Sequence, residues 1–311
     1  MGYKMLFLDL DDTLLSSDLS ISEENLDAIR RASDIGVKVI ICTGRGIFSV
    51  QHIAEKLKIE WNNCYIICLN GGAVYKGFPP VLIKERLFDN KTASLIYDTA
   101  KKYGVDIQIY RDDMLILDNI SERVQMYIEK LKPKYILIDS IADYDGEIAK
   151  VLLSGSNDIL LKIEKELNQK LKGKYNIFLS NPNYLEFTAC GTTKGEAMAE
   201  LSEIIGVDLS QTIAIGDSFN DMSMIQIAGL GVAVRNAVEP LKLRADYITK
   251  STHDENAVAE VIDRFIFNKG KVSKNIYKFR FPVMIFIIIL IIEQLLASAF
   301  GLSGFKIVQY L

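Results

Sequence analysis

Cysteine is scarce in this chain, which has four in 311 residues: Cys42, Cys64, Cys68 and Cys190. They are scattered, and three of them lie in or beside apolar runs that look like strands. We therefore expect reduced core residues of a cytosolic protein and no disulfide framework. Cys64 and Cys68 have CxxxC spacing, but no second pair completes a zinc site.

An excess of positive charge is also lacking, because the formal net charge is −4, so nothing global attracts nucleic acid. No secretory signal peptide is expected, since Met1-Gly2-Tyr3-Lys4 leads straight into a short apolar run with Asp9 behind it. Repeats and low-complexity segments are absent as well. The chain does have 49% hydrophobic residues, enough for a large core, and its length suggests two domains.

Short apolar strands alternate with helices in the first part of the chain, which predicts a parallel sheet covered on both faces. The strands are expected at 4–9, 37–42 and 65–69, and the helices at 22–35 and 46–57. The same rhythm returns after residue 188, with helices at 194–205, from 220 and at 255–267, and strands at 212–215 and 231–234.

Between these parts the rhythm changes to helices and paired strands. Arg111-Asp112-Asp113 and Asn181-Pro182-Asn183 read as hairpin turns. We therefore predict an α/β protein whose Rossmann-like core is discontinuous, with a separate α+β domain inserted into it. The expected ranges are 1–82 and 189–267 for the core, 83–188 for the insertion, and 268–311 for a basic linker with a hydrophobic tail.

Four polar clusters follow predicted core strands, at the sheet edge where ligands of open parallel sheets bind. They are Asp9-Leu10-Asp11-Asp12-Thr13, Thr43-Gly44-Arg45, Asn70-Gly71-Gly72 and Gly216-Asp217-Ser218-Phe219-Asn220-Asp221. One such cluster alone is often just helix capping. Four on one edge are hard to explain in this way, because acids converge there without enough nearby cations.

A divalent metal would relieve this crowding, since Asp9 and Asp217 come from two different strands and one hard cation could bridge them. Mg²⁺ suits a few carboxylates, waters and a substrate phosphate. An EF-hand is excluded because the loop lacks its glycine and terminal glutamate. Thr43-Gly44-Arg45 has the hydroxyl and backbone N–H groups that suit an anion. Lys194, at a helix start, would either neutralise the acids and a phosphate or simply be solvated.

In this order the motifs DLDDT, TGR, GTTKG and GDSFNDMSM resemble those of the haloacid dehalogenase-like hydrolase superfamily, in particular its Cof-type (IIB) phosphatases. The resemblance covers roughly Met1 to Phe267 and extends to Asn70-Gly71-Gly72 and to Tyr184-Leu185-Glu186. It implies that the insertion is an α/β cap of the C2 type, which closes over the site and selects the leaving group.

The resemblance also implies roles for single residues. Asp9 would be the nucleophile that forms an aspartyl-phosphate, and Asp11 the general acid and then the general base. Mg²⁺ would be held by Asp9, the backbone carbonyl of Asp11, and Asp217. Asn220 and Asp221 would lie behind these ligands, with Asp221 orienting Lys194. The phosphate and substrate would be bound by Thr43, Gly44, Arg45, Asn70, Gly71, Lys194 and Asn220. Asp12 stands where many members have glycine, and is read as a turn or cap residue.

The function implied is a Mg²⁺-dependent phosphatase of small phosphorylated metabolites. A phosphosugar mutase or phosphotransferase of the same superfamily is the nearest alternative. Two non-enzymatic alternatives are a phospho-receiver domain and a membrane-tethered binding protein. The inserted domain and GDSFND argue against a receiver, and the presence of all the acids and of Lys194 argues against a silent binder.

The last segment has a different composition, because 268–311 holds six basic residues and one acid. Its 25-residue stretch Phe281–Phe305 is long enough, as a helix, to span a hydrocarbon core of about 30 Å. Glu293 near its middle costs about 2.5–3.5 kcal/mol, which the neighbouring apolar residues nearly balance. We expect it to hold a cytoplasmic catalytic body on the membrane; packing on a partner chain or an unstructured end are the alternatives. The oligomeric state stays open.

Overall fold

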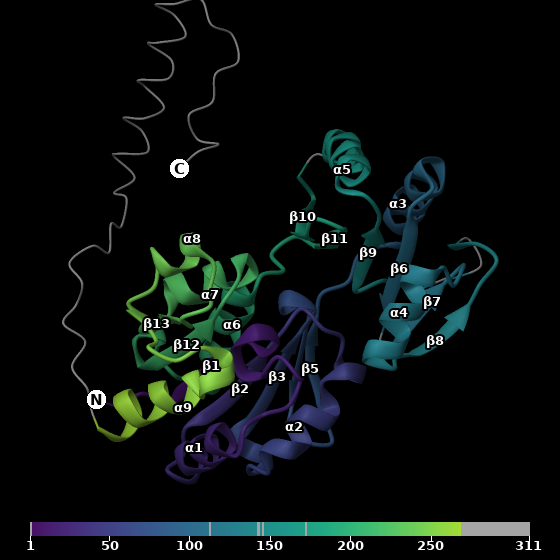
Figure 1. The fold of residues 1–311 in the computed structure, drawn as a ribbon. Coiled ribbons are helices and arrows are strands. Elements are labelled where there is room, and N and C mark those ends of the chain that lie inside the picture. The colour runs from purple at the N-terminus through teal and green to yellow at the C-terminus, as the bar shows by residue number, and fades with distance from the viewer. Residues whose placement is uncertain (1, 112, 142–143, 145, 172, 269–311) are drawn as a thin grey trace, which may run out of the picture. The chain divides into compact units, whose positions relative to one another are not determined.

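The computed structural model describes residues 2–111, 113–141, 144, 146–171 and 173–268 (Figure 1). The hydrophobic stretch 281–305 lies outside these residues, so its expected membrane association is not addressed by the structure. Among the helices that are described, none combines the length and the apolar character needed to cross a bilayer.

The first sheet has eight strands in the order β14-β13-β12-β1-β2-β3-β4-β5. Its first six strands in this order pair in parallel, as predicted from the alternating pattern, and β4 and β5 are antiparallel additions at one edge. The bounds are β1 Met5–Leu8, β2 Lys38–Cys42, β3 Cys64–Cys68, β4 Ala73–Lys76, β5 Val81–Glu85, β12 Thr212–Gly216, β13 Leu230–Ala233 and β14 Tyr247–Ile248. Every residue of β1 is buried, which explains its unbroken apolar run.

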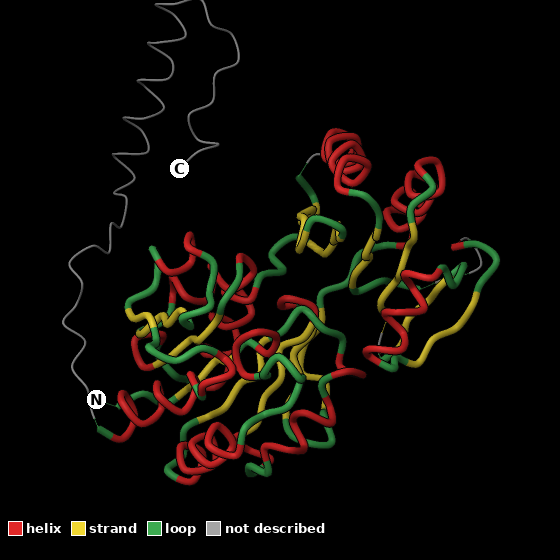
Figure 2. Tube along the Cα trace, viewed as in Figure 1, coloured by secondary structure: helices red, strands yellow, loops and turns green. Residues whose placement is uncertain are grey.

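Two groups of helices flank this sheet. Helix α1 (Glu23–Asp34) packs against α2 (Gln51–Leu57) and α9 (Ala257–Ile262), and α6 (Lys194–Ile205) packs against α7 (Met222–Ile227). Figure 2 shows these red helices around the yellow strands. The remaining helix, α8, spans Glu239–Lys242. The helices expected at 46–57 and 255–267 are shorter than predicted and are extended by 3₁₀ or π turns at Ile47–Ser49, His253–Glu255 and Asp263–Phe267.

The second sheet has six strands in the order β10-β11-β9-β6-β7-β8. Its bounds are β6 Asp106–Arg111, β7 Met114–Leu117, β8 Lys134–Leu137, β9 Lys150–Ser154, β10 Tyr175–Asn181 and β11 Tyr184–Ala189. Helices α3 (Asn90–Tyr103) and α5 (Asn157–Leu171) share an apolar core with one face of this sheet, while α4 spans Glu122–Leu131. Strand β5 belongs to the first sheet, and the first strand of the second sheet along the chain, β6, begins at Asp106.

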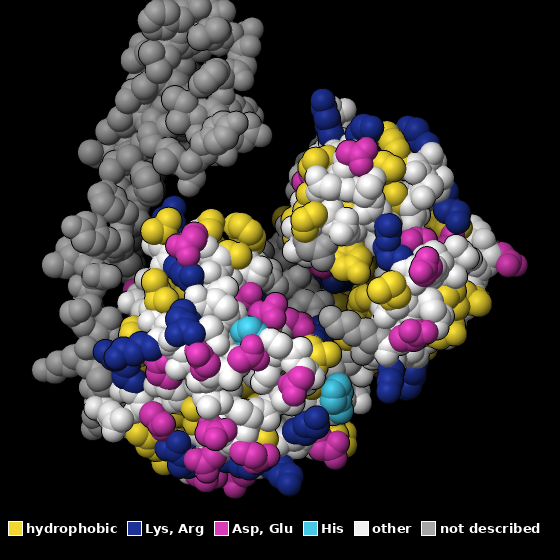
Figure 3. All heavy atoms as spheres, viewed as in Figure 1, with side chains coloured by type: hydrophobic (Ala, Val, Ile, Leu, Met, Phe, Trp, Pro, Cys, Tyr) yellow, Lys and Arg dark blue, Asp and Glu magenta, His cyan; other side chains and the backbone are white. Residues whose placement is uncertain are grey.

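On the face of the molecule shown in Figure 3, acidic and basic side chains are interspersed.

Candidate active site

The polar clusters predicted to meet at one edge do so. Asp9, Thr43 and Asp217 directly follow β1, β2 and β12, and Asn70 follows β3 within the short turn η4 (Leu69–Gly71). These residues line a cavity of about 1250 Å³, together with residues of the second sheet such as Tyr110. The cavity opens where the carboxyl ends of parallel strands place ligands in open α/β sheets.

Asp12, the third acid after β1, lies in the turn that follows this strand. Asp12 has a φ of 55°, in the left-handed region, and its side chain is 69% exposed. This geometry agrees with its interpretation as a turn residue, since aspartate tolerates the left-handed conformation. Thr13, the next residue, donates from Oγ1 to Asp217 Oδ1 at 3.2 Å and so ties this turn to β12.

Lys194 lies at the centre of the acid cluster. It is the first residue of α6, whose N-cap is Thr193, and its side chain is 0% exposed. Its Nζ lies 2.5 Å from Asp9 Oδ1 and 2.6 Å from Asp221 Oδ1. The alternative that Lys194 is simply solvated is therefore wrong, because its ammonium group is buried between two carboxylates.

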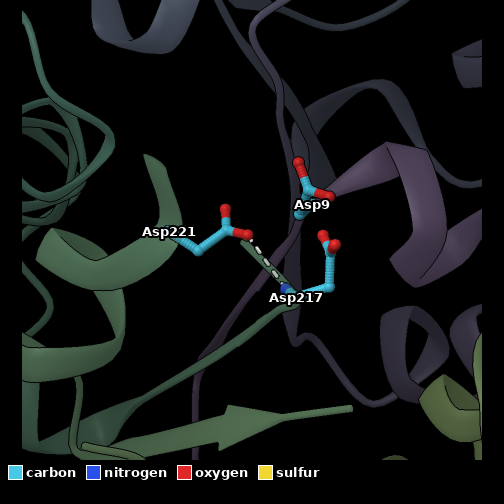
Figure 4. Close-up of side chains that lie close together, drawn as sticks. All are labelled: Asp9, Asp217 and Asp221. Atoms are coloured by element: carbon cyan, nitrogen blue, oxygen red, sulfur yellow. Dashed lines mark hydrogen bonds between the residues drawn. The ribbon is translucent and has the colours of Figure 1, made fainter. Parts of the chain in front are cut away.

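Asp221 uses its second oxygen to hold the neighbouring loop. Its Oδ2 accepts from the backbone N–H groups of Asp217 at 2.9 Å and Ser218 at 3.0 Å, and its Oδ1 is bound by Lys194. Figure 4 shows the carboxylates of Asp9, Asp217 and Asp221 converging, with the bond between Asp221 and the Asp217 backbone dashed. Asp221 thus orients both Lys194 and the loop that carries Asp217.

The three acids also have the composition of a divalent-metal site, since one carboxylate oxygen from each lies within 4.8 Å of the others. Both Asp221 oxygens are engaged by protein donors, so Asp9 and Asp217 are the better ligands of the three. Three carboxylates against one ammonium leave an excess of negative charge that a divalent cation would offset.

Burial shifts the pKa values of Asp9, Asp217 and Lys194 when no metal is bound. Burial, and then the charge of Asp221, raise the pKa of the Asp9 carboxyl well above its ordinary value, although Lys194 acts in the opposite direction. The same two causes raise the pKa of Asp217 to about 7. Burial lowers the pKa of Lys194, but Asp221 and Asp9 outweigh this and raise it overall, so the ammonium stays charged. A cation bound by Asp9 and Asp217 would favour their ionised forms.

Asp11 lines the same cavity as Asp9 and pairs with Arg45. Arg45 Nε donates to Asp11 Oδ2 at 2.8 Å, and Nη2 donates to Oδ1. Thr43 is buried, and its Oγ1 accepts from the Arg45 backbone N–H at 3.1 Å. The two residues predicted to act on the leaving group and to bind substrate are thus joined as a bidentate ion pair.

Of the two predicted binding residues in η4, Asn70 lines the cavity and Gly71 does not. Gly71 has a φ of +107°, and a Cβ there would lie 2.5 Å from the Thr193 carbonyl oxygen, so glycine permits the close approach of η4 to the start of α6. Asn70 is buried, and its Oδ1 accepts from Asn220 Nδ2 at 3.1 Å.

Lys150 was not predicted from the sequence, and Glu186 was named there only within the resemblance. Both line the cavity from the second sheet, and Lys150 Nζ lies 2.8 Å from Glu186 Oε2. The signal that could have found Lys150 is alternation, because β9 reads KVLLS and places Lys150 opposite in direction to Val151.

The fold and the site define an α/β protein with an acid-lined pocket at the carboxyl edge of a parallel sheet. Comparison with known proteins identifies it further. The sequence profile of the family described as haloacid dehalogenase-like hydrolase matches residues 6–262, so the chain belongs to this family. The assignment expected from the four motifs is confirmed.

Individual relatives agree with this assignment. The chain is 32% identical over 290 residues to the 5-amino-6-(5-phospho-D-ribitylamino)uracil phosphatase YwtE of Bacillus subtilis, covering 85% of this chain and 98% of that protein. It is also 32% identical over 264 residues to YcsE, a second 5-amino-6-(5-phospho-D-ribitylamino)uracil phosphatase of Bacillus subtilis, covering 85% of this chain and 96% of that protein. The crystal structure of a haloacid dehalogenase-like hydrolase from Bacteroides thetaiotaomicron superposes with a TM-score of 0.79 at 33% identity, covering 85% of this chain and 100% of the other. These names agree with the enzyme class predicted from the sequence.

Proposed function

We propose that this protein is a Mg²⁺-dependent phosphatase of small phosphorylated metabolites that works through an aspartyl-phosphate on Asp9. The observation that carries the proposal is the buried cluster in which Lys194 contacts both Asp9 and Asp221 while Asp217 lies beside Asp9. A nucleophilic carboxylate beside a fixed cation, at the base of a cavity, suits attack on a phosphomonoester.

Asp9 would attack phosphorus with a carboxylate oxygen, forming a bond to phosphorus as the bond to the leaving alcohol breaks. Asp11 would give its proton to the leaving oxygen, and would then take a proton from the water that hydrolyses the aspartyl-phosphate. Because Asp11 accepts from Arg45 with both carboxylate oxygens, it would first separate from Arg45 and take up a proton from water or from the substrate phosphate. An incoming phosphate offers the guanidinium an alternative bidentate partner.

Mg²⁺ would be held by the carboxylates of Asp9 and Asp217 and by the backbone carbonyl of Asp11. When bound, it would neutralise charge on the phosphoryl group. Thr43 and Lys194 would bind the phosphoryl oxygens, with Gly44 and Arg45 completing this loop. Asn220 and Asp221 would support the ligands from behind.

The insertion expected at 83–188 would act as the cap that encloses the leaving group. Its residues Tyr110, Tyr127 and Arg123 line the cavity, which is large enough for a leaving group well beyond a single phosphate. Two relatives are named for a ribitylaminouracil phosphate, so we include this compound among the candidate substrates.

Phosphate release from a panel of phosphomonoesters, with and without Mg²⁺, tests the proposal. The panel should include sugar phosphates, nucleotides and 5-amino-6-(5-phospho-D-ribitylamino)uracil. We expect release from monophosphates that depends on Mg²⁺ and is lost on adding a chelator. No release from any compound, or release that a chelator leaves unchanged, would refute it.

We also propose that the stretch 281–305 attaches this catalytic body to the cytoplasmic face of a membrane. Its length, its apolar composition and the basic residues before it support this. Carbonate extraction of the expressed full chain is the test. Retention in the membrane pellet is expected, and release into the supernatant would rule out an anchor.

A further inference from the structure

The second sheet carries a buried charged pair on the face opposite its apolar core. On β9 and β11, Val151, Leu153 and Phe187 point into the core shared with α3 and α5. Lys150 and Glu186 alternate with them, and are only 3% and 6% exposed. Burying two charges is costly even when they are paired, so a pair such as this is weak evidence for stability and calls for another role.

Within the second sheet, Lys150 Nζ also lies 4.9 Å from the centroid of the Tyr110 ring on β6. The other partners of the pair lie in loops at the edge of the first sheet. Lys150 Nζ donates to the Gly44 carbonyl oxygen at 3.3 Å, and Glu186 Oε2 accepts from Asn70 Nδ2 at 3.4 Å. The same Oε2 atom receives Lys150 at 2.8 Å, so one carboxylate oxygen serves both donors. The contact between Lys150 and Glu186 within the second sheet is short. The contacts of Lys150 with Gly44 and of Glu186 with Asn70, which cross to the loops of the first sheet, are longer.

The groups contacted in the first sheet belong to the loops that would hold the phosphoryl group. Asn70 accepts from Asn220 Nδ2 through Oδ1, and its backbone N–H donates to the Thr43 carbonyl at 2.9 Å. Gly44 lies between Thr43 and Arg45. Both ends of the Asn70 carboxamide are thus engaged by protein, one by the first sheet and one by the second.

We propose that Lys150 and Glu186 are positioning residues for phosphoryl transfer. Glu186 fixes the orientation of the Asn70 carboxamide, and through it Asn220, while Lys150 fixes the Gly44 carbonyl and with it the loop of Thr43 and Arg45. Lys150 also neutralises Glu186, which would otherwise present an unpaired negative charge to the substrate phosphate. The correct placement of the insertion is thereby coupled to the geometry of the phosphoryl pocket. This proposal rests on the phosphatase function proposed above.

A direct contact with the leaving group is the competing explanation, because Lys150 and Glu186 also line the cavity. The two differ in how the effect depends on substrate. Residues that position the phosphoryl pocket affect every phosphomonoester by the same factor, whereas residues that bind one leaving group affect only substrates that have it.

The main variant is the double substitution Lys150→Met/Glu186→Leu, because replacing a buried ion pair with apolar residues of similar size usually preserves folding. We expect its thermal midpoint to equal or exceed that of the wild type. We expect kcat/KM to fall by about tenfold or more, by the same factor for p-nitrophenyl phosphate and for the best metabolite of the panel. A fall on one substrate alone, or unchanged kcat/KM on both, would overturn the proposal.

Single variants and a control complete the test. Glu186→Gln keeps an oxygen acceptor for Asn70 and should retain activity within about threefold, whereas Glu186→Ala should lose about tenfold. Glu166→Gln is the matched control: it neutralises a carboxylate of the same domain that pairs with Lys170 and Lys102 away from the cavity, and should not change activity. Equal losses in Glu186→Gln and Glu186→Ala would contradict the assigned role.

Binding of inorganic phosphate in the presence of Mg²⁺, measured by calorimetry, gives a readout that does not need turnover. The double variant should bind phosphate several-fold more weakly than the wild type, and equal affinity would contradict the proposal. Failure of the phosphatase function is distinguishable, because it appears as a wild-type protein that releases no phosphate from any substrate.

Discussion

At the scale of single residues, the environment of Lys194 shows that the polar clusters at this sheet edge are more than ordinary helix caps. A lysine in the first turn of a helix is unfavourable for the helix dipole and is usually solvated. Here it lies between two acids, and its partner Asp9 is 185 positions away in the chain. The sequence could supply the lysine and the acids, but only the tertiary fold decides that they meet.

Replacing Lys194 by methionine tests this arrangement. The change leaves the Asp9 and Asp221 carboxylates buried without their cation, so the free energy of unfolding should fall by about 3–5 kcal/mol. Urea unfolding of the metal-free protein measures it. Lys134→Met is the control, since that side chain is 73% exposed and its loss should change stability little. Equal stabilities of the Lys194 variant and the wild type would contradict a buried ion cluster.

The pKa of Asp217, raised to about 7 by burial and by Asp221, predicts how metal binding depends on pH. Without metal, the folded state binds a proton at Asp217 more tightly than the unfolded state, whose pKa is ordinary. This contribution to stability is present at low pH and is lost as the pH rises toward 7. Mg²⁺ competes with that proton, so its stabilising effect has the opposite sign and grows with pH.

The rise of the thermal midpoint on adding Mg²⁺, followed from about pH 5 to pH 8, measures this effect. We expect a small rise at the acidic end and a larger, constant one above about pH 7.5. Asp217→Asn should remove most of the rise and reduce its pH dependence to the part that comes from Asp9. A rise of the same size at every pH would show that Asp217 does not titrate against the metal.

At the scale of secondary structure, the ends of strands were the most predictable features. Apolar runs and the polar clusters behind them identify β1, β2, β3 and β12, because a buried parallel strand must be apolar until it reaches the sheet edge. Short turns were less predictable. The segments 46–57 and 255–267 have helical spacing, but hydrophobic periodicity does not distinguish an α-helix from 3₁₀ or π turns at its ends.

The start of α6 offers a test at this scale, since Thr193 caps the helix by accepting from the Glu196 N–H at 3.1 Å. Thr193→Ala should lower stability by about 1 kcal/mol. It should also lower kcat/KM by roughly tenfold, because Lys194 is the first residue of the helix and shifts with it. Ser22→Ala removes the equivalent cap of α1, where Asn25 N donates to Ser22 Oγ at 3.2 Å. It should cost similar stability and leave activity unchanged; equal activities of the two variants would contradict the coupling.

At the scale of the whole molecule, the sequence predicted a parallel core, an inserted α+β region and a family, and it predicted which loops converge. It did not predict that the second sheet contributes the charged pair of Lys150 and Glu186 to the cavity. Lys150 stands in a strand that reads as apolar. Its contact with Glu186 depends on the pairing of β9 with β11, and its contact with Gly44 depends on how the second sheet meets the loop after β2. Such contacts leave no local pattern in the chain.

Replacing Asp9 tests its proposed role as the nucleophile most directly. Asp12→Asn is a matched control, because it makes the same chemical change in the same turn at an exposed side chain, and asparagine accepts its φ of 55°. Phosphate release by the wild type and both variants, with saturating Mg²⁺ and the best substrate, is the measurement. We expect the turnover number to fall by about 10³-fold or more for Asp9→Asn and to stay near that of the wild type for Asp12→Asn. Wild-type turnover by Asp9→Asn would contradict this role.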